Sequence, residues 1–173
     1  MLRAILEPWH DFFTLVGASA ATLVGLMFVA ASVGTGFFTE ERQVGLRTLL
    51  SPTVVAFSGV LAACIVGVLP SPNWSVPSAL LGGMGLLGTL YSASVWQRMI
   101  RDGIAGKIDL EDRIWYAFAP ALAYVALTIA GVAFALQSEV ATALLAAGIC
   151  MLLLADIRNA WDMTTWVVLR RQG

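Results

Sequence analysis

The sequence predicts an all-α protein: a polytopic bundle of about five transmembrane helices that forms a single domain over residues 1–173. The first observation is composition, because 59% of the residues are hydrophobic and only 12% are charged, against about 25% charged in soluble domains. The second is that no Asp, Glu, Lys or Arg occurs in the fifty residues from Thr48 to Gln97. One membrane-spanning helix needs only about twenty apolar residues. The bilayer is therefore the expected environment of this chain.

The first three spans follow from the positions of charges and prolines. The run from Phe12 to Phe38 is uncharged and predicts a span at about 12–38. The long uncharged stretch that follows divides at the proline-rich segment "PSPNWSVPS". This division gives a second span at about 50–69 and a third at about 78–97. Ser51 followed by Pro52 is typical of a helix start, so we expect the second helix to begin there.

The last two spans are predicted at about 114–136 and 140–160, separated by the short segment "QSE". Pro120 lies inside the fourth span and predicts a kink. In the fifth, only Gly148 disfavours a helix between Val140 and Arg170, and membrane helices tolerate glycine. We expect one long helix that leaves the hydrocarbon near Asp156.

The positive charges predict the orientation of the bundle. Five spans place the termini on opposite sides of the membrane. With the N-terminus outside, the outer segments hold only Arg3, and the inner ones hold nine basic residues: Arg42, Arg47, Arg98, Arg101, Lys107, Arg113, Arg158, Arg170 and Arg171. Because basic residues accumulate on the cytoplasmic side of membrane proteins, we predict the N-terminus outside and the C-terminus in the cytoplasm.

The third span contains Gly83, Gly85 and Gly88 in the spacing G-x-G-x-x-G, which is the glycine pattern of dinucleotide-binding turns. That function requires a preceding buried strand, and the prolines before this segment exclude one. Within a membrane span, small residues allow two helix backbones to approach closely. The three glycines are therefore predicted to be helix-packing residues, and no cofactor is predicted.

The first span carries small residues four apart at Gly17, Ala21 and Gly25, accompanied by the hydroxyls of Thr14 and Ser32. Small residues at this spacing favour close helix contact. Three alternatives remain open: the stripe packs within one chain, it meets the same helix in other copies, or it lines a pore whose modest polarity the hydroxyls supply.

Polar residues at the outer end form the pattern E-x-x-H-D, with Glu7, His10 and Asp11. A metal site in one chain needs three or four ligands, and this sequence has a single histidine. We therefore predict no metal site and interpret these residues as a solvated interfacial cap. In a symmetric oligomer the same residues would form an acidic ring at a pore mouth.

A second charged cluster is predicted at the inner end of the last helix. Arg158 and Asp162 are four residues apart and can pair on one helix face. Asp156 points to a different side, and a carboxylate at the edge of the hydrocarbon usually has a partner. Its predicted partner is one of the arginines on other helices: Arg42, Arg47, Arg98 or Arg101. The cluster is interpreted as an inter-helix lock, with a gate or a docking patch as the alternative.

The segment "GASAATLVGLMFVAAS" in the first span resembles the opening helix of a widespread group of uncharacterised bacterial multi-pass inner-membrane proteins, whose pattern is similar to A-x-L-x-G-L-x-F-V-A-x-S. Eight residues carry the match: Ala21, Leu23, Gly25, Leu26, Phe28, Val29, Ala30 and Ser32. The "NAW" at 159–161 resembles that group as well. The resemblance implies the bacterial inner membrane, and it implies no activity and no functional residues.

Enzymatic functions find little support in the sequence. No span core contains an Asp, and a serine hydrolase would depend on His10 as its base. The net charge of −1 does not indicate a nucleic-acid partner. We predict no catalytic residues and a non-catalytic membrane protein that acts through helix–helix contact as a subunit, scaffold or regulator. Its partners would be the lipid bilayer, other copies of the chain or another membrane protein. The alternative is a homo-oligomeric channel for ions or small solutes, with the first helix lining the pore.

Overall fold

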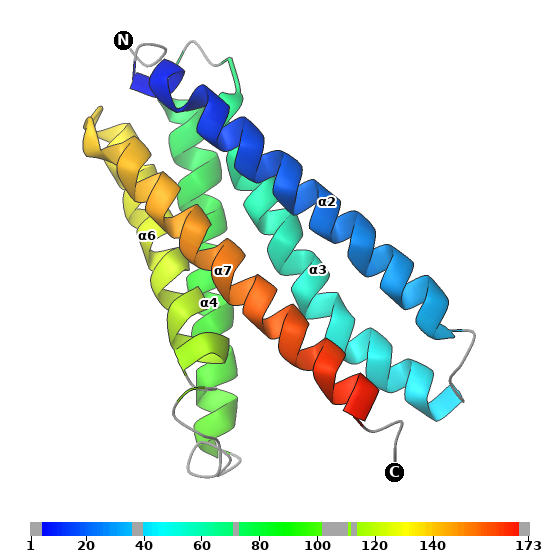
Figure 1. Cartoon of the computed structure of the whole chain (residues 1–173). Coiled ribbons are helices and arrows are strands. Elements are labelled where there is room, and N and C mark those ends of the chain that lie inside the picture. The colour runs from blue at the N-terminus through cyan, green and yellow to red at the C-terminus, as the bar shows by residue number, and fades with distance from the viewer. Residues whose placement is uncertain (1–4, 36–39, 71–72, 102–110, 112–113, 170–173) are drawn as a thin grey trace.

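The computed structural model describes residues 5–35, 40–70, 73–101, 111 and 114–169, without the side chains of residues 30, 31, 33–35, 40–52, 95, 98, 99 and 163–169. Figure 1 shows the elements in chain order: η1 (Glu7–Trp9), α2 (His10–Thr35), α3 (Glu40–Val68), α4 (Ser75–Arg101), η2 (Ile114–Phe118), α6 (Ala119–Ala135) and α7 (Val140–Leu169). The described residues form helices and no strand. The all-α prediction is confirmed.

Four helical segments are long and apolar enough to cross a membrane: Glu7–Val29, Ser75–Ser94, Ile114–Ala135 and Val140–Asp162. Within α3, the described apolar part is the shorter segment Thr53–Val68. The chain therefore has the multi-pass membrane character that its composition predicts. Five spans and the orientation of the termini stay predictions.

The helices are arranged as two antiparallel pairs joined by α7. The first pair is α2 with α3, and the second is α4 with α6. The last helix packs against both α6 and α3, whereas α3 and α4 scarcely contact each other. Figure 1 shows α2 at one edge of the bundle and α6 at the opposite edge, and the ends of α2, α3 and α7 near the C-terminus lean away from α4 and α6.

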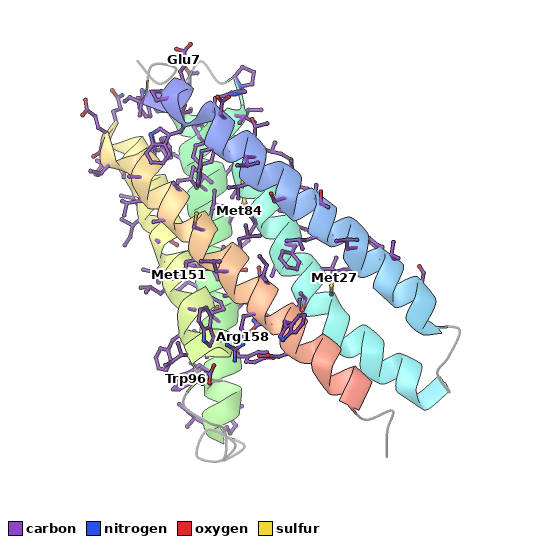
Figure 2. The ribbon with its side chains drawn as sticks, viewed as in Figure 1. Glu7, Met27, Met84, Trp96, Met151 and Arg158 are labelled. Atoms are coloured by element: carbon purple, nitrogen blue, oxygen red, sulfur yellow. The ribbon has the colours of Figure 1, made fainter. Side chains whose placement is uncertain are left out.

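The centre of the bundle is formed by large side chains on the inner faces of α3, α6 and α7. On α7 the fully buried residues Leu145, Ile149 and Leu152 recur every three or four positions, so they share one helix face. They pack in one apolar cluster with Leu127 and Phe134 of α6. In Figure 2, Met151 on α7 and Met84 on α4 lie midway between the labelled Glu7 and Trp96 at opposite ends.

The structure differs from the prediction at two prolines. The second helix begins at Glu40 instead of Ser51, so Pro52 lies inside α3. The segment before Pro52 contains no strong helix breaker, and membrane helices tolerate an internal proline. In the fourth span, Pro120 lies in the first turn of α6, preceded by the π-helical turn η2. Pro120 cannot donate to the carbonyl four residues earlier, so the turn before it widens instead of kinking the middle of the helix.

Candidate functional site

The first helix contacts the rest of the bundle along one narrow face. Phe13, Val16, Gly17 and Ala20 are buried, and α3 is the neighbour. A Cβ atom at Gly17 would lie 3.1 Å from Cβ of Cys64. Gly17, the first member of the predicted small-residue stripe, therefore packs within the chain.

The opposite side of α2 is not covered by any described part of the chain. We call it the outer face of α2, and it consists of the exposed small or hydroxylated residues Thr14, Ala18, Ala21, Thr22, Gly25 and Ser32. A Cβ atom placed at Gly25 would meet nothing within 4 Å. The stripe thus divides: Gly17 turns toward α3, whereas Ala21 and Gly25 point out of the bundle.

The hydroxyls on this side of α2 are bonded to the helix itself. Thr14 and Thr22 each donate to the carbonyl oxygen four residues earlier at 2.8 Å. Ser32 makes the same bond at 2.8 Å. Because the hydroxyl protons are satisfied in this way, the outer face of α2 can lie against lipid or another helix without contact with water.

The glycines of the third span lie on two sides of α4. A Cβ atom at Gly85 would be 2.6 Å from Oγ1 and 2.8 Å from Cα of Thr128 on α6. At Gly88 it would clash with the ring of Tyr124. Gly83 is exposed, and a Cβ atom placed there would meet nothing within 4 Å, so Gly83 does not pack against another helix of the described chain. Its side of the helix faces away from α6, because α4 and α6 meet along the face that carries Gly85.

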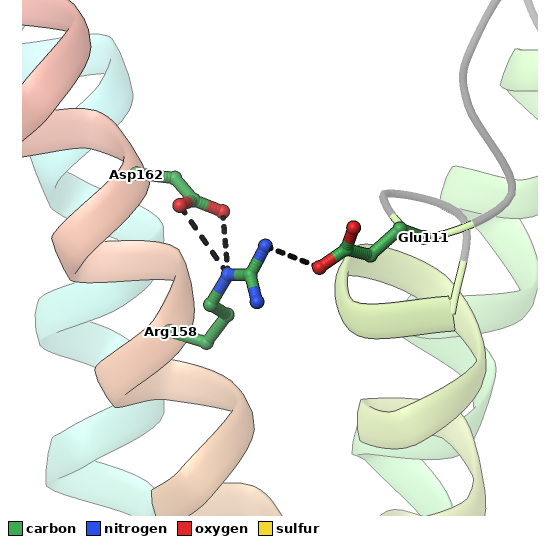
Figure 3. A network of polar contacts seen from close by, with 3 residues as sticks. All are labelled: Glu111, Arg158 and Asp162. Atoms are coloured by element: carbon green, nitrogen blue, oxygen red, sulfur yellow. Dashed lines mark hydrogen bonds and ion pairs between the residues drawn. The ribbon is translucent and has the colours of Figure 1, made fainter.

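Arg158 is the centre of a polar network at the inner end of the bundle (Figure 3). Its Nη2 donates to Oε1 of Glu111 at 2.7 Å, and its Nε donates to Oδ2 of Asp162 at 3.1 Å. The guanidinium carbon also lies 5.9 Å from the ring centroid of Trp115 in η2. These contacts connect α7 to the residues that begin the fourth span, as an inter-helix lock would.

Asp156 precedes Arg158 by two residues, so it lies on a different side of α7, and it is 4% exposed. Within the described part of the chain its Oδ2 has no hydrogen-bond partner, and the same is true of Oδ1 of Asn159. Arg101, one of its four predicted partners, is exposed and forms no ion pair with it in that part. The side chains of Arg42, Arg47 and Arg98 lie outside the described residues, so an ion pair with one of them stays a prediction.

The acidic residues at the other end of the molecule lie in η1 and the first turn of α2. Glu7 is exposed, and Nδ1 of His10 lies 3.5 Å from Oδ1 of Asp11, with both side chains largely in solvent. Three or more His, Cys, Asp or Glu side chains do not gather into a metal-binding group anywhere in the described residues. The arrangement fits a solvated helix start.

Sequence reasoning missed Glu111 as a partner of Arg158. The register of the hairpin indicates this region. The turn between α6 and α7 lies at Gln137, and equal distances along the two antiparallel helices from that turn pair Arg158 with Tyr116, next to Trp115. Gly82 and Gly131, which contact each other between α4 and α6, were missed because their spacing matched no known motif.

The ion-pair network gives a prediction about salt. Replacing Arg158 with glutamine removes contacts to two acids, so we expect a modest fall in the midpoint of thermal unfolding in detergent. Arg158 is partly exposed, so the difference from the parent should shrink at high ionic strength. Glu111→Gln should lower the stability less in the Arg158→Gln variant than in the parent, because the ion pair between Arg158 and Glu111 is already absent from that variant. If the stability losses of the two single variants add up in the double variant, or if salt does not change them, the network is contradicted.

The outer face of α2 offers small residues, and the network around Arg158 joins helices within the chain. Comparisons of the chain with protein-family models, with curated proteins and with solved structures find no match.

Proposed function

We propose that this protein is a non-catalytic multi-pass membrane protein that acts through helix–helix contact, as a subunit, scaffold or regulator. The outer face of α2 is its contact surface. The observation that supports this proposal is that α2 lies at the edge of the bundle with Ala18, Ala21 and Gly25 turned outward.

Association of helices in lipid depends on close packing more than on apolar area. Apolar area alone gives no driving force there, because lipid tails are as apolar as side chains. Close packing of small residues does provide one. Two such pairs, Ala18 with Thr22 and Ala21 with Gly25, lie four residues apart on the exposed side of α2. A second copy of this chain, or a helix of another membrane protein, fits this surface.

The same proposal places the protein in the bacterial inner membrane, with its N-terminus outside and its C-terminus in the cytoplasm. The one-sided distribution of Lys and Arg supports this orientation. The resemblance of the first helix to bacterial inner-membrane proteins supports the compartment.

The experiment compares two glycines that have equal space around them. Gly25→Leu and Gly83→Leu each add a side chain where nothing lies within 4 Å, so both variants should fold like the parent. We expect Gly25→Leu to weaken self-association or partner capture in nanodiscs, because leucine separates the helix backbones. Gly83→Leu, on α4, should associate like the parent.

The outcomes separate the alternatives. Loss of association with Gly83→Leu alone would assign the contact to α4 and contradict the proposal. Association around an aqueous axis, with ion conductance in planar bilayers that Thr14 and Ser32 substitutions change, would favour the homo-oligomeric channel. The self-bonded hydroxyls of α2 favour helix contact, because they do not require water.

A further inference from the structure

A groove of about 690 Å³ lies between the first turns of α4 and the last turns of α6. From α4 it is lined by Ser75, Ser78, Ala79 and Gly82, which share one helix face because they recur every three or four residues. The opposite wall and the end are formed by Gly131, Val132, Ala135, Asn73, Trp74 and Gln137. Its volume lies within the range of about 300–1,000 Å³ that is usual for small-molecule sites.

The lining changes from polar to apolar along the groove. The candidate membrane spans begin at Ser75 on α4 and end at Ala135 on α6. Trp74 and Gln137 lie just beyond these ends, at the level where a bilayer changes from hydrocarbon to headgroups, and tryptophan favours that level. Gly82 and Gly131 lie deeper, within the spans. The groove therefore runs from the polar boundary into the hydrocarbon.

Gln137 has an unusual backbone conformation for its residue type. Its φ of +57° is left-handed, and it follows the last turn of α6. Gln137 N donates to Phe134 O at 3.0 Å, and Ser138 N donates to Ala133 O at 2.9 Å. These two bonds define a helix end at which glycine is the favoured residue, because it has no Cβ. The chain instead has a glutamine at this position, and this residue lines the groove.

We propose that this groove binds one membrane phospholipid through its ester region and one acyl chain. Ester carbonyls accept hydrogen bonds, and Gln137, Trp74 and Ser75 carry uncharged groups that can donate them. The acyl chain lies along Ala79 and Ala135, over the floor that Gly82 and Gly131 form where the backbones of α4 and α6 meet. The groove lining contains no Lys or Arg, so recognition does not depend on the charge of the headgroup.

The proposal is tested by native mass spectrometry of the full chain in detergent. The probes are phosphatidylcholine and phosphatidylglycerol with identical acyl chains. We expect one lipid to be retained, with similar affinity for both probes and little dependence on salt. Gln137→Gly should keep or raise the unfolding midpoint yet weaken binding by about fivefold, the loss expected for about one hydrogen bond.

A second pair of variants tests the apolar part of the groove. Ala79→Phe fills it from an exposed position on α4 and should reduce lipid retention. Ala93→Phe adds the same ring at an exposed position of α4 outside the groove lining and should leave retention unchanged. Equal retention by the parent, Gln137→Gly and Ala79→Phe would show non-specific annular lipid only and would overturn the proposal. Salt-sensitive binding of phosphatidylglycerol alone would overturn it as well, because it would indicate a cationic site.

Discussion

Leucine in place of Gly85 is expected to destabilise the protein by about 3 kcal/mol or more, at or above the upper end of the usual cost of overpacking. Even a Cβ atom at this position would lie 2.6 Å from Oγ1 and 2.8 Å from Cα of Thr128. The Cα belongs to the backbone of α6, which cannot move aside as a flexible side chain does. The two helices would therefore have to separate along their shared face. The midpoint of thermal unfolding in detergent measures the effect.

Gly83→Leu is the matched control for this substitution, because it lies two residues away on the same helix. A Cβ atom there would meet nothing within 4 Å, so the new side chain would face lipid. We expect the stability of the single chain to stay within about 0.5 kcal/mol of the parent, as is usual for surface substitutions. Equal losses for Gly85→Leu and Gly83→Leu would show that the contact between α4 and α6 is not the cause.

Alanine in place of Phe13 is expected to cost about 3 kcal/mol, as is typical for the loss of a buried phenyl ring. Phe13 is 1% exposed and packs against α3 where Gly67 leaves space for its ring, since a Cβ atom at Gly67 would lie 2.8 Å from that ring. The change leaves a cavity at the contact between α2 and α3. The same unfolding assay measures it.

Phe28→Ala provides the comparison on the same helix. Phe28 is 61% exposed and lies on the side of α2 that faces away from α3. Its removal should leave the stability of the single chain nearly unchanged. A large loss with Phe28→Ala and little with Phe13→Ala would mean that α2 packs on the bundle through its other side.

Most of the fold could be predicted from the sequence because the bilayer restricts what an uncharged run can form. A run such as 12–38 has to be a helix there, since every backbone polar group needs an internal partner. Helix starts could not be predicted as well, because residues that begin a helix in water, such as proline, are tolerated inside a membrane helix. Ser51 and Pro52 would mark a helix start in water, yet α3 continues through them. Pro120 shows the opposite difference: the sequence predicts a kink in the interior of the fourth span, but Pro120 lies in the first turn of α6.

The candidate sites were harder to predict, because a stripe of small residues specifies close approach but not the partner. Gly17 and Gly25 belong to one stripe in the sequence, but eight residues of helix rotate them onto different sides, and only Gly17 meets α3. The pair of Arg158 with Asp162 could be predicted because it is local, four residues apart on one helix. Its third member, Glu111, is 47 residues distant and depends on the register between α6 and α7.

The position of α7 between the two helix pairs has a consequence for synthesis. During translation the two hairpins enter the membrane first, and they scarcely contact each other. The helix that joins them is made after both, so the native arrangement can form only once α7 has been synthesised. A nascent chain that stops before Val140 would leave two separate hairpins in the bilayer, with inner faces that no native neighbour covers. Uncovered faces of this kind make a partly folded chain prone to aggregation.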